Sequence, residues 1–152
     1  MSLKLKIPPP VQGLIWGLIM WGVAQVMSGW NHTFSGQKYV GFALIFVGLS
    51  IEFISAAAFF RQKTTVNPLK PENATSLVSS GLYKISRNPM YLGLLTLLSG
   101  WAVILGNPVN IAALAAFVAG MNWLQIIPEE KHLTRKFGQS YKDYKRRVRR
   151  WI

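Results

Sequence analysis

The sequence predicts an all-α integral membrane protein with about four transmembrane helices and a C-terminal basic amphipathic helix. Three observations support this fold class. About half of the 152 residues are hydrophobic and only 14% are charged, which is unusual for a soluble protein. Four apolar runs approach or reach the length needed to cross a hydrocarbon core. The formal net charge is +12, and beside four apolar runs it favours an anionic membrane surface over nucleic acid as the partner.

Residues 1–60 are expected to form the first two transmembrane helices. The run from Val11 to Trp30 is about twenty residues long. We interpret it as a retained helix because it lacks a convincing signal-peptide cleavage site. A second helix is expected from about Tyr39 to Phe60. Glu52 lies inside it, and an ionisable residue at that depth is a candidate for substrate binding. The alternatives are a protonated side chain or a pair with a neighbouring helix.

Residues 61–152 form the motif-bearing half of a single expected domain. A polar segment, 62–80, precedes Asn88-Pro89. Asn is a favoured N-cap and Pro a favoured first helical residue, so a helix is expected to begin here. The apolar run 90–105 and a further helix at 111–127 then predict a tight antiparallel hairpin.

Small residues recur at four-residue spacing along the last apolar helix. They are Ala112, Ala116 and Gly120, together with Ala115 and Ala119. This spacing lets helices approach closely in lipid. Tight packing within the hairpin is the favoured interpretation, and a homodimer interface is the alternative.

The tail from Glu129 to Ile152 is predicted to be one amphipathic helix. Its apolar stripe recurs at helical spacing and consists of Leu133, Phe137, Tyr141, Tyr144, Val148 and Trp151. Nine Lys and Arg lie between Lys131 and Arg150. Such a helix suits the headgroup layer of an anionic membrane, and no nucleic-acid partner is expected.

Basic residues also predict the topology. All but one of them lie in the first six residues, in the segment 61–87 or in the tail, and Lys38 is the exception. The positive-inside rule therefore predicts a multi-pass protein with both termini in the cytoplasm. The polar segment, Asn88 and the tail are expected to share that side.

Several classes of site are excluded by composition. The chain has no cysteine and only two histidines, His32 and His132, so no metal site is expected. The sequence also lacks the glycine-rich fingerprint of a Rossmann domain, a P-loop and a Gly-x-Ser-x-Gly turn.

The helix start at Asn88 is the first candidate site. Unpaired amide groups and the positive end of the helix dipole can bind a carboxylate there. Arg87 adds a cation, and Tyr83 and Tyr91 add hydroxyls and ring faces. The alternative is a well-capped helix whose Arg87 extends to lipid headgroups.

Glu129-Glu130, directly after Pro128, is the second candidate site. Acidic residues in a first helical turn commonly complement its dipole. Asn122, Gln125 and Glu129, however, step by three and four along one helix face. Polar side chains in that arrangement on a membrane helix point to a partner or a cavity.

These motifs, in this order, resemble those of the isoprenylcysteine carboxyl methyltransferase and phospholipid methyltransferase family. The resemblance extends from about Thr75 to Arg149. It rests on Leu77-Val78, Gly81-Leu82-Tyr83, Arg87-Asn88-Pro89-Met90-Tyr91-Leu92-Gly93, Glu129-Glu130 and Phe137-Gly138 with Tyr141, Tyr144 and Val148.

The resemblance implies an integral-membrane methyltransferase that uses S-adenosylmethionine, with a lipid or lipid-like acceptor. The implied cofactor-binding residues, with Arg87 added for its charge, are Thr75, Ser76, Leu77, Val78, Tyr83, Arg87, Asn88, Pro89, Met90 and Tyr91. Glu129 is implied on the substrate side, and it is also the nearest candidate for a catalytic base. Gln125 and Glu52 complete the expected substrate residues.

Two departures from the family pattern affect the chemistry. Asn88 stands where the family usually has His, so acid–base catalysis from that position is not expected. Gln125 stands where eukaryotic lipid-cysteine methyltransferases have Arg, which removes a partner for a substrate carboxylate. A membrane reductase with a nicotinamide cofactor and a non-catalytic lipid-binding membrane protein remain as alternatives.

Overall fold

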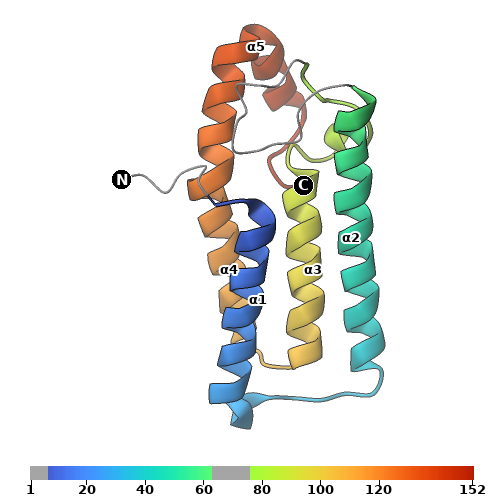
Figure 1. Cartoon of the computed structure of the whole chain (residues 1–152), viewed down its shortest axis with the longest axis vertical. Helices are drawn as coiled ribbons and strands as arrows, with labels where there is room; N and C mark the ends of the chain where they lie inside the picture. The colour runs from blue at the N-terminus through green and yellow to red at the C-terminus, as the bar shows by residue number, and fades with distance from the viewer. Residues whose placement is uncertain (1–6, 63–75) are drawn as a thin grey trace.

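The computed structural model describes residues 7–62 and 76–152, which form a bundle of long helices (Figure 1). The long elements are α1 (Pro9–Val26), α2 (Gln37–Arg61), α3 (Pro89–Leu105), α4 (Asn110–Met121), the π-helix η4 (Asn122–Ile126) and α5 (Ile127–Arg147). Two short 3₁₀ helices are η1 (Ser28–Trp30) and η3 (Gly81–Lys84). The described residues form no β-strand, which confirms the predicted all-α class.

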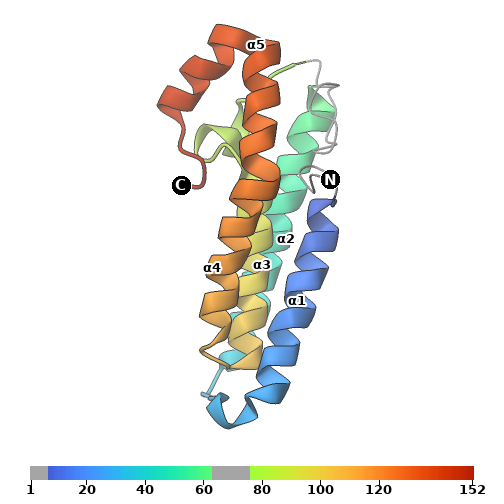
Figure 2. The same ribbon diagram turned by 90° about the vertical axis from the view of Figure 1, so that its left-hand side faces the viewer.

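Successive long helices run in opposite directions, and α4, η4 and α5 continue one another (Figure 2). The start of α1, the end of α2, the start of α3 and α5 therefore lie at one end of the bundle. The sequence predicted that Asn88 and the tail share a side, and both lie at this end. Most of the polar segment, residues 63–75, falls outside the described residues.

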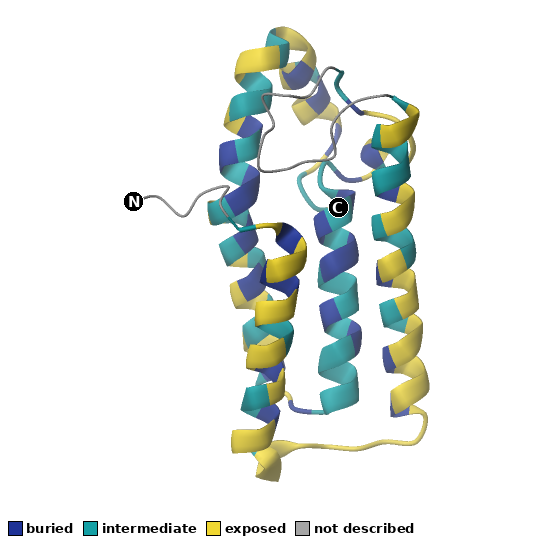
Figure 3. Ribbon diagram, viewed as in Figure 1, coloured by how far each residue is buried: buried dark blue, intermediate teal, exposed yellow. Residues whose placement is uncertain are grey.

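Much of the outer surface of the bundle consists of exposed residues (Figure 3), and many of these are large apolar side chains. Phe42, Phe46 and Phe53 on α2 are 60%, 72% and 78% exposed, which is typical of a surface that faces lipid. By length and composition, α2 and the run 110–147, which comprises α4, η4 and α5, can each cross a membrane, and α3 is apolar but has 17 residues. Two of the four predicted spans therefore meet this criterion.

The closest helix contact joins α2 and α3. A Cβ atom built on Gly48 would lie 2.6 Å from the carbonyl oxygen of Gly93, and one on Gly100 would lie 2.6 Å from that of Gly41. Each helix therefore carries two glycines seven residues apart, and the antiparallel pairing matches them. Only glycine lets the two backbones approach this closely.

The expectation that small residues pack the α3–α4 hairpin tightly is wrong. Ala112, Ala115, Ala116 and Ala119 are exposed, and a Cβ atom on Gly120 would meet no atom within 4 Å. Larger side chains make the core of this part of the bundle instead. Its fully buried members are Met20 from α1, Leu98 from α3, Phe117 and Met121 from α4, and Ile126 from η4.

The tail is not one helix to Ile152, as the sequence predicted. Gly138 adopts φ 53° and ψ −122°, which breaks the helix, because glycine reaches positive φ without the steric cost that other residues meet. Beyond this kink α5 turns back towards the bundle and ends at Arg147. Residues 148–152, here called the C-terminal strap, then run along the segment before α3.

The aromatic stripe of α5 is buried against the protein rather than presented to headgroups. Tyr141, Tyr144 and Val148 form a cluster with exposed fractions of 3%, 3% and 8%. Leu77, Leu133 and Phe137 pack against them. The basic side chains of α5 remain largely on the outside, with Lys131, Arg135, Lys136, Lys142, Lys145, Arg146 and Arg147 exposed.

Candidate active site

Tyr91 and Glu129 meet at the start of α3. The Tyr91 hydroxyl donates a 2.9 Å hydrogen bond to Oε2 of Glu129, and the Gln125 side chain also hydrogen-bonds to Tyr91. Tyr91 is 6% exposed and Gln125 is fully buried. The structure thus brings together three residues from the two regions that the sequence marked as candidate sites.

The π-helix η4 separates α4 from the two glutamates. A π-helix inserts extra backbone into a helix, and such segments are frequent at functional sites. Gln125 and Glu129 both reach Tyr91, as expected for one face. Asn122 has a different partner, because its Oδ1 accepts a 3.2 Å hydrogen bond from Nε1 of Trp151 in the strap.

Glu129 and Glu130 follow Pro128 and lie beyond the apolar part of the helix, which ends at Ile127. Glu129 retains some exposed surface, but burial of its carboxyl group raises its pKa to about 7, and the negative charge of Glu130 adds to the rise. The hydrogen bond from Tyr91 acts in the opposite direction. A carboxyl group poised near neutrality suits a general base.

Glu130 is the centre of a cluster of cations. Arg87 Nη1 lies 3.0 Å from its Oε1, and Arg150 donates to both carboxylate oxygens at 3.0 Å. Lys145 Nζ lies 3.7 Å from Oε2. Burial opposes ionisation of Glu130, but the Arg150 hydrogen bonds and the three positive charges outweigh it and lower the pKa. Two adjacent glutamates are thus tuned in opposite directions.

The C-terminal strap holds the approach to α3. The Arg87 amide donates to the Arg149 carbonyl at 2.9 Å, within a parallel bridge between Ser86 and Arg149. Nδ2 of Asn88 donates to the Arg150 carbonyl at 2.9 Å. Asn88 does occupy the N-cap position, but its side chain makes no capping hydrogen bond. The predicted side-chain cap is therefore wrong, because Asn88 binds the strap instead.

Tyr83 lies on the α2 side of the same region. Its ring meets that of Phe59 edge to face, with centroids 5.5 Å apart, and its carbonyl accepts a 2.7 Å hydrogen bond from the Tyr144 hydroxyl. Burial, together with the negative charge of Glu129, raises the pKa of Tyr83. Tyr83 therefore stays neutral. It lies close enough to Glu129 for the negative charge of that residue to affect the Tyr83 pKa.

The other predicted residues divide into several groups. Arg87 is committed to Glu130 rather than free, and its side chain is 9% exposed. Pro89 is fully buried as the first residue of α3, and Met90 packs against the bundle core. Val78 is buried and Leu77 packs on the α5 cluster. Ser76 is half-buried, and Thr75 lies outside the described residues.

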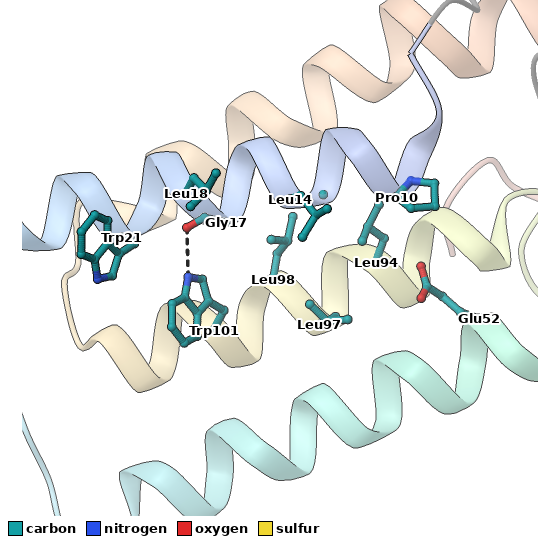
Figure 4. A pocket seen from close by; sticks show the side chains of 11 residues that line it. Pro10, Leu14, Gly17, Leu18, Trp21, Glu52, Leu94, Leu97, Leu98 and Trp101 are labelled. Atoms are coloured by element: carbon teal, nitrogen blue, oxygen red, sulfur yellow. Dashed lines mark hydrogen bonds between the residues drawn. The ribbon is translucent and has the colours of Figure 1, made fainter.

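Glu52 of α2 lies beside Gly93 of α3, at one end of a groove between α1 and α3 (Figure 4). The groove has a volume of about 770 Å³, and leucines, glycines and tryptophans supply most of its lining. Sequence analysis missed this groove, and it also assigned Trp151 to the membrane surface. The strap was not foreseeable, because its contacts depend on the kink at Gly138.

Comparison with known proteins connects this geometry to a family. A family model described as phospholipid methyltransferase matches residues 37–140. The chain belongs to this family. The matched range includes α2, α3 and both glutamates, so the expected resemblance is confirmed at the level of the family.

Relatives in other organisms carry related names. The chain is 29% identical over 111 residues to a probable protein-S-isoprenylcysteine O-methyltransferase of Oryza sativa subsp. indica, covering 73% of this chain and 58% of that protein. It is 32% identical over 108 residues to protein-S-isoprenylcysteine O-methyltransferase B of Arabidopsis thaliana, covering 71% and 55%. The chain thus spans little more than half the length of these curated relatives.

A shorter relative is an uncharacterized protein of Haemophilus influenzae. It is 43% identical over 63 residues, which is 41% of this chain and all of that protein. No solved structure gave a significant match. The family description and the plant names indicate a methyltransferase.

Proposed function

We propose that this protein transfers a methyl group from S-adenosylmethionine to a lipid-like acceptor at the end of the bundle where α3 begins. The observation that carries the proposal is the Tyr91–Glu129 hydrogen bond, because it joins the two family motifs. Tyr91 is buried, and Glu129 retains some exposed surface. Membership of the phospholipid methyltransferase family supports the reaction class.

The residues at this end fit such a cofactor. A sulfonium cation is stabilised by aromatic faces, and Tyr83 and Tyr91 supply two such rings within electrostatic reach of each other. Since the Asn88 side chain does not cap α3, the first-turn amides suit the cofactor carboxylate. Arg87 was expected to help there, but its ion pair with Glu130 gives it a positioning role instead.

S-adenosylmethionine, when bound, would supply an electrophilic methyl group on sulfur. The task of the protein is then chiefly to align the acceptor and exclude water. An amine or thiol acceptor must also lose a proton, and Glu129 is the residue placed to accept it. A carboxylate acceptor is already nucleophilic and needs no base. Tyr91 and Gln125 would fix the orientation of the Glu129 carboxyl group.

The membrane arrangement belongs to the same proposal. Four spans, α1, α2, α3 and α4, would place both termini and the candidate site on the cytoplasmic side. The exposed basic side chains of α5 would then face the anionic headgroups of that leaflet. The exposed alanines of α4 suit a contact with a second copy of the chain.

The decisive experiment is calorimetry on detergent-solubilised protein with S-adenosylmethionine, S-adenosylhomocysteine and NADPH. We expect heat of binding with the first two and none with NADPH. Binding of NADPH alone would favour a membrane reductase. Binding of none of the three by a folded sample would favour a non-catalytic lipid-binding protein.

A further inference from the structure

The groove between α1 and α3 has two chemically different ends. Glu52 lies at one end near Pro10, and Trp21 and Trp101 lie at the other (Figure 4). Trp101 is fixed there, because its Nε1 donates a 3.0 Å hydrogen bond to the Gly17 carbonyl. The wall between the ends is apolar.

Glu52 is unusual among the charged residues of the protein. Within residues 7–62 and 76–152 it has neither a hydrogen bond nor an ion pair, and it is half-buried. Its neighbour is Gly93 of α3, where a Cβ atom would lie 2.7 Å from Glu52 Cγ. An ionisable side chain at membrane depth that lacks a protein partner marks a ligand site.

We propose that this groove binds one aliphatic chain of an amphiphile, with the polar group beside Glu52 and the chain end against Trp21 and Trp101. In naming the amphiphile as the methyl acceptor, the proposal rests on the proposed function. Because the anchoring group is a carboxyl group, the polar group of the ligand is neutral or cationic and not anionic.

The groove also sets a length. Pro10 and Trp21 are eleven residues apart on α1, so the two ends are separated by roughly 16 Å at 1.5 Å per residue. An extended chain of about twelve carbons spans that distance, and a much longer chain would have to leave the groove at the tryptophans. Trp21 and Trp101 are therefore inferred to determine chain length.

The test uses the whole chain in phosphatidylcholine nanodiscs and three probes: 12-bromododecylamine, 12-bromododecanol and 12-bromododecanoate. Bromine quenches tryptophan fluorescence on contact, and a seated chain reaches Trp21 and Trp101, two of the six tryptophans. Binding in the groove therefore adds a saturable component to the quenching that bulk lipid produces. We expect saturable quenching by the amine and the alcohol, and weaker quenching by the carboxylate. Glu52→Gln should abolish the preference for the amine over the carboxylate.

Two glycines of α1 provide matched variants. A Cβ atom on Gly17, which lines the groove, would make only an ordinary 4.0 Å contact with Leu98, and one on Gly22 would meet no atom within 4 Å. Gly17→Leu should fill the groove and raise the half-saturating amine concentration about tenfold or more. Gly22→Leu should match the wild type. Leu18→Phe is a second groove-filling variant if Gly17→Leu does not fold.

Equal, non-saturable quenching in all variants would overturn the proposal, because it would indicate bulk lipid. The two proposals can fail separately. Absence of cofactor binding together with intact saturable quenching would refute the proposed methyl transfer but not ligand binding in the groove. Normal methyl transfer to a long-chain acceptor by folded Gly17→Leu would refute ligand binding in the groove but not the proposed methyl transfer.

Discussion

Replacing Glu130 with Gln should destabilise the protein through the cation cluster. The change keeps the size of the side chain but leaves Arg87, Arg150 and Lys145 without their shared anion. Arg87 and Glu130 are both only 9% exposed as side chains, and removing one partner from a buried pair costs about 3–5 kcal/mol. Arg150 and Lys145 are 35% and 38% exposed, so each of those contacts adds only about 0–1 kcal/mol.

We therefore expect the free energy of unfolding to fall by about 3 kcal/mol, near the lower end of that range, because part of the cluster remains hydrated. For a chain of this size that corresponds to a fall of roughly 6–12 °C in the unfolding midpoint. Thermal unfolding of the two proteins in the same detergent and at the same scan rate measures it.

The matched control is Asp143→Asn. Asp143 pairs with Arg146 at 3.6 Å, but these side chains are 48% and 77% exposed, so the loss should be under about 0.5 kcal/mol. Arg87→Gln and the double variant complete a cycle, and we expect a coupling of at least about 1 kcal/mol between Arg87 and Glu130. Equal small losses for Glu130→Gln and Asp143→Asn, or no coupling, would refute the reasoning.

Three further predictions concern the site and the topology. Glu129→Gln should lower turnover of an amine acceptor about 10²–10⁴-fold with cofactor affinity nearly intact. Turnover of the wild type should rise as the pH increases through about 7, and turnover that does not change with pH would exclude Glu129 as the base. Asn88→Ala should cost about 1 kcal/mol by releasing the strap, whereas Asn88→His should retain cofactor binding in calorimetry. A Cys introduced at Gln139 should resist impermeant reagents in intact cells, and its labelling would contradict the cytoplasmic tail.

The raised pKa of Glu129 also has a consequence for stability. A carboxyl group whose folded pKa lies above 4.5 contributes stability that is fully present below pH 4.5 and is lost as the pH rises through about 7. Glu129→Gln should therefore gain stability relative to the wild type between pH 5 and pH 8. Glu130, whose pKa is lowered, should show the opposite trend.

Periodicity and local signals in the sequence identified the helices well. Pro89 does begin α3, and the apolar runs do become α1 to α4. The sequence predicted that Tyr91 and Glu129 lie at the same end of the bundle but not that they contact each other. Their hydrogen bond depends on the π-helix, which has no simple sequence signature. Asn88 was misjudged because local capping propensity ignores a competing partner, here the Arg150 carbonyl.

The contact between α2 and α3 carried a signal that sequence analysis overlooked. Gly41 and Gly48 are spaced like Gly93 and Gly100, and this repeat on two apolar helices is visible in the sequence itself. The alanines of α4 have a shorter and more regular spacing, but four of them are exposed. Spacing alone does not reveal which helix face turns outward.

The glycine contacts also limit where the proposed lipid-like acceptor could enter from the side. Between α2 and α3, backbone atoms leave less room than a single methyl group needs at Gly48 and Gly93. An acyl chain therefore cannot pass between α2 and α3 unless the two helices separate. Under the proposed function, the acceptor would enter from the bilayer on the other flank of α3, which faces α1. Side chains rather than backbone atoms fill the gap there, so rotamer changes suffice to open it.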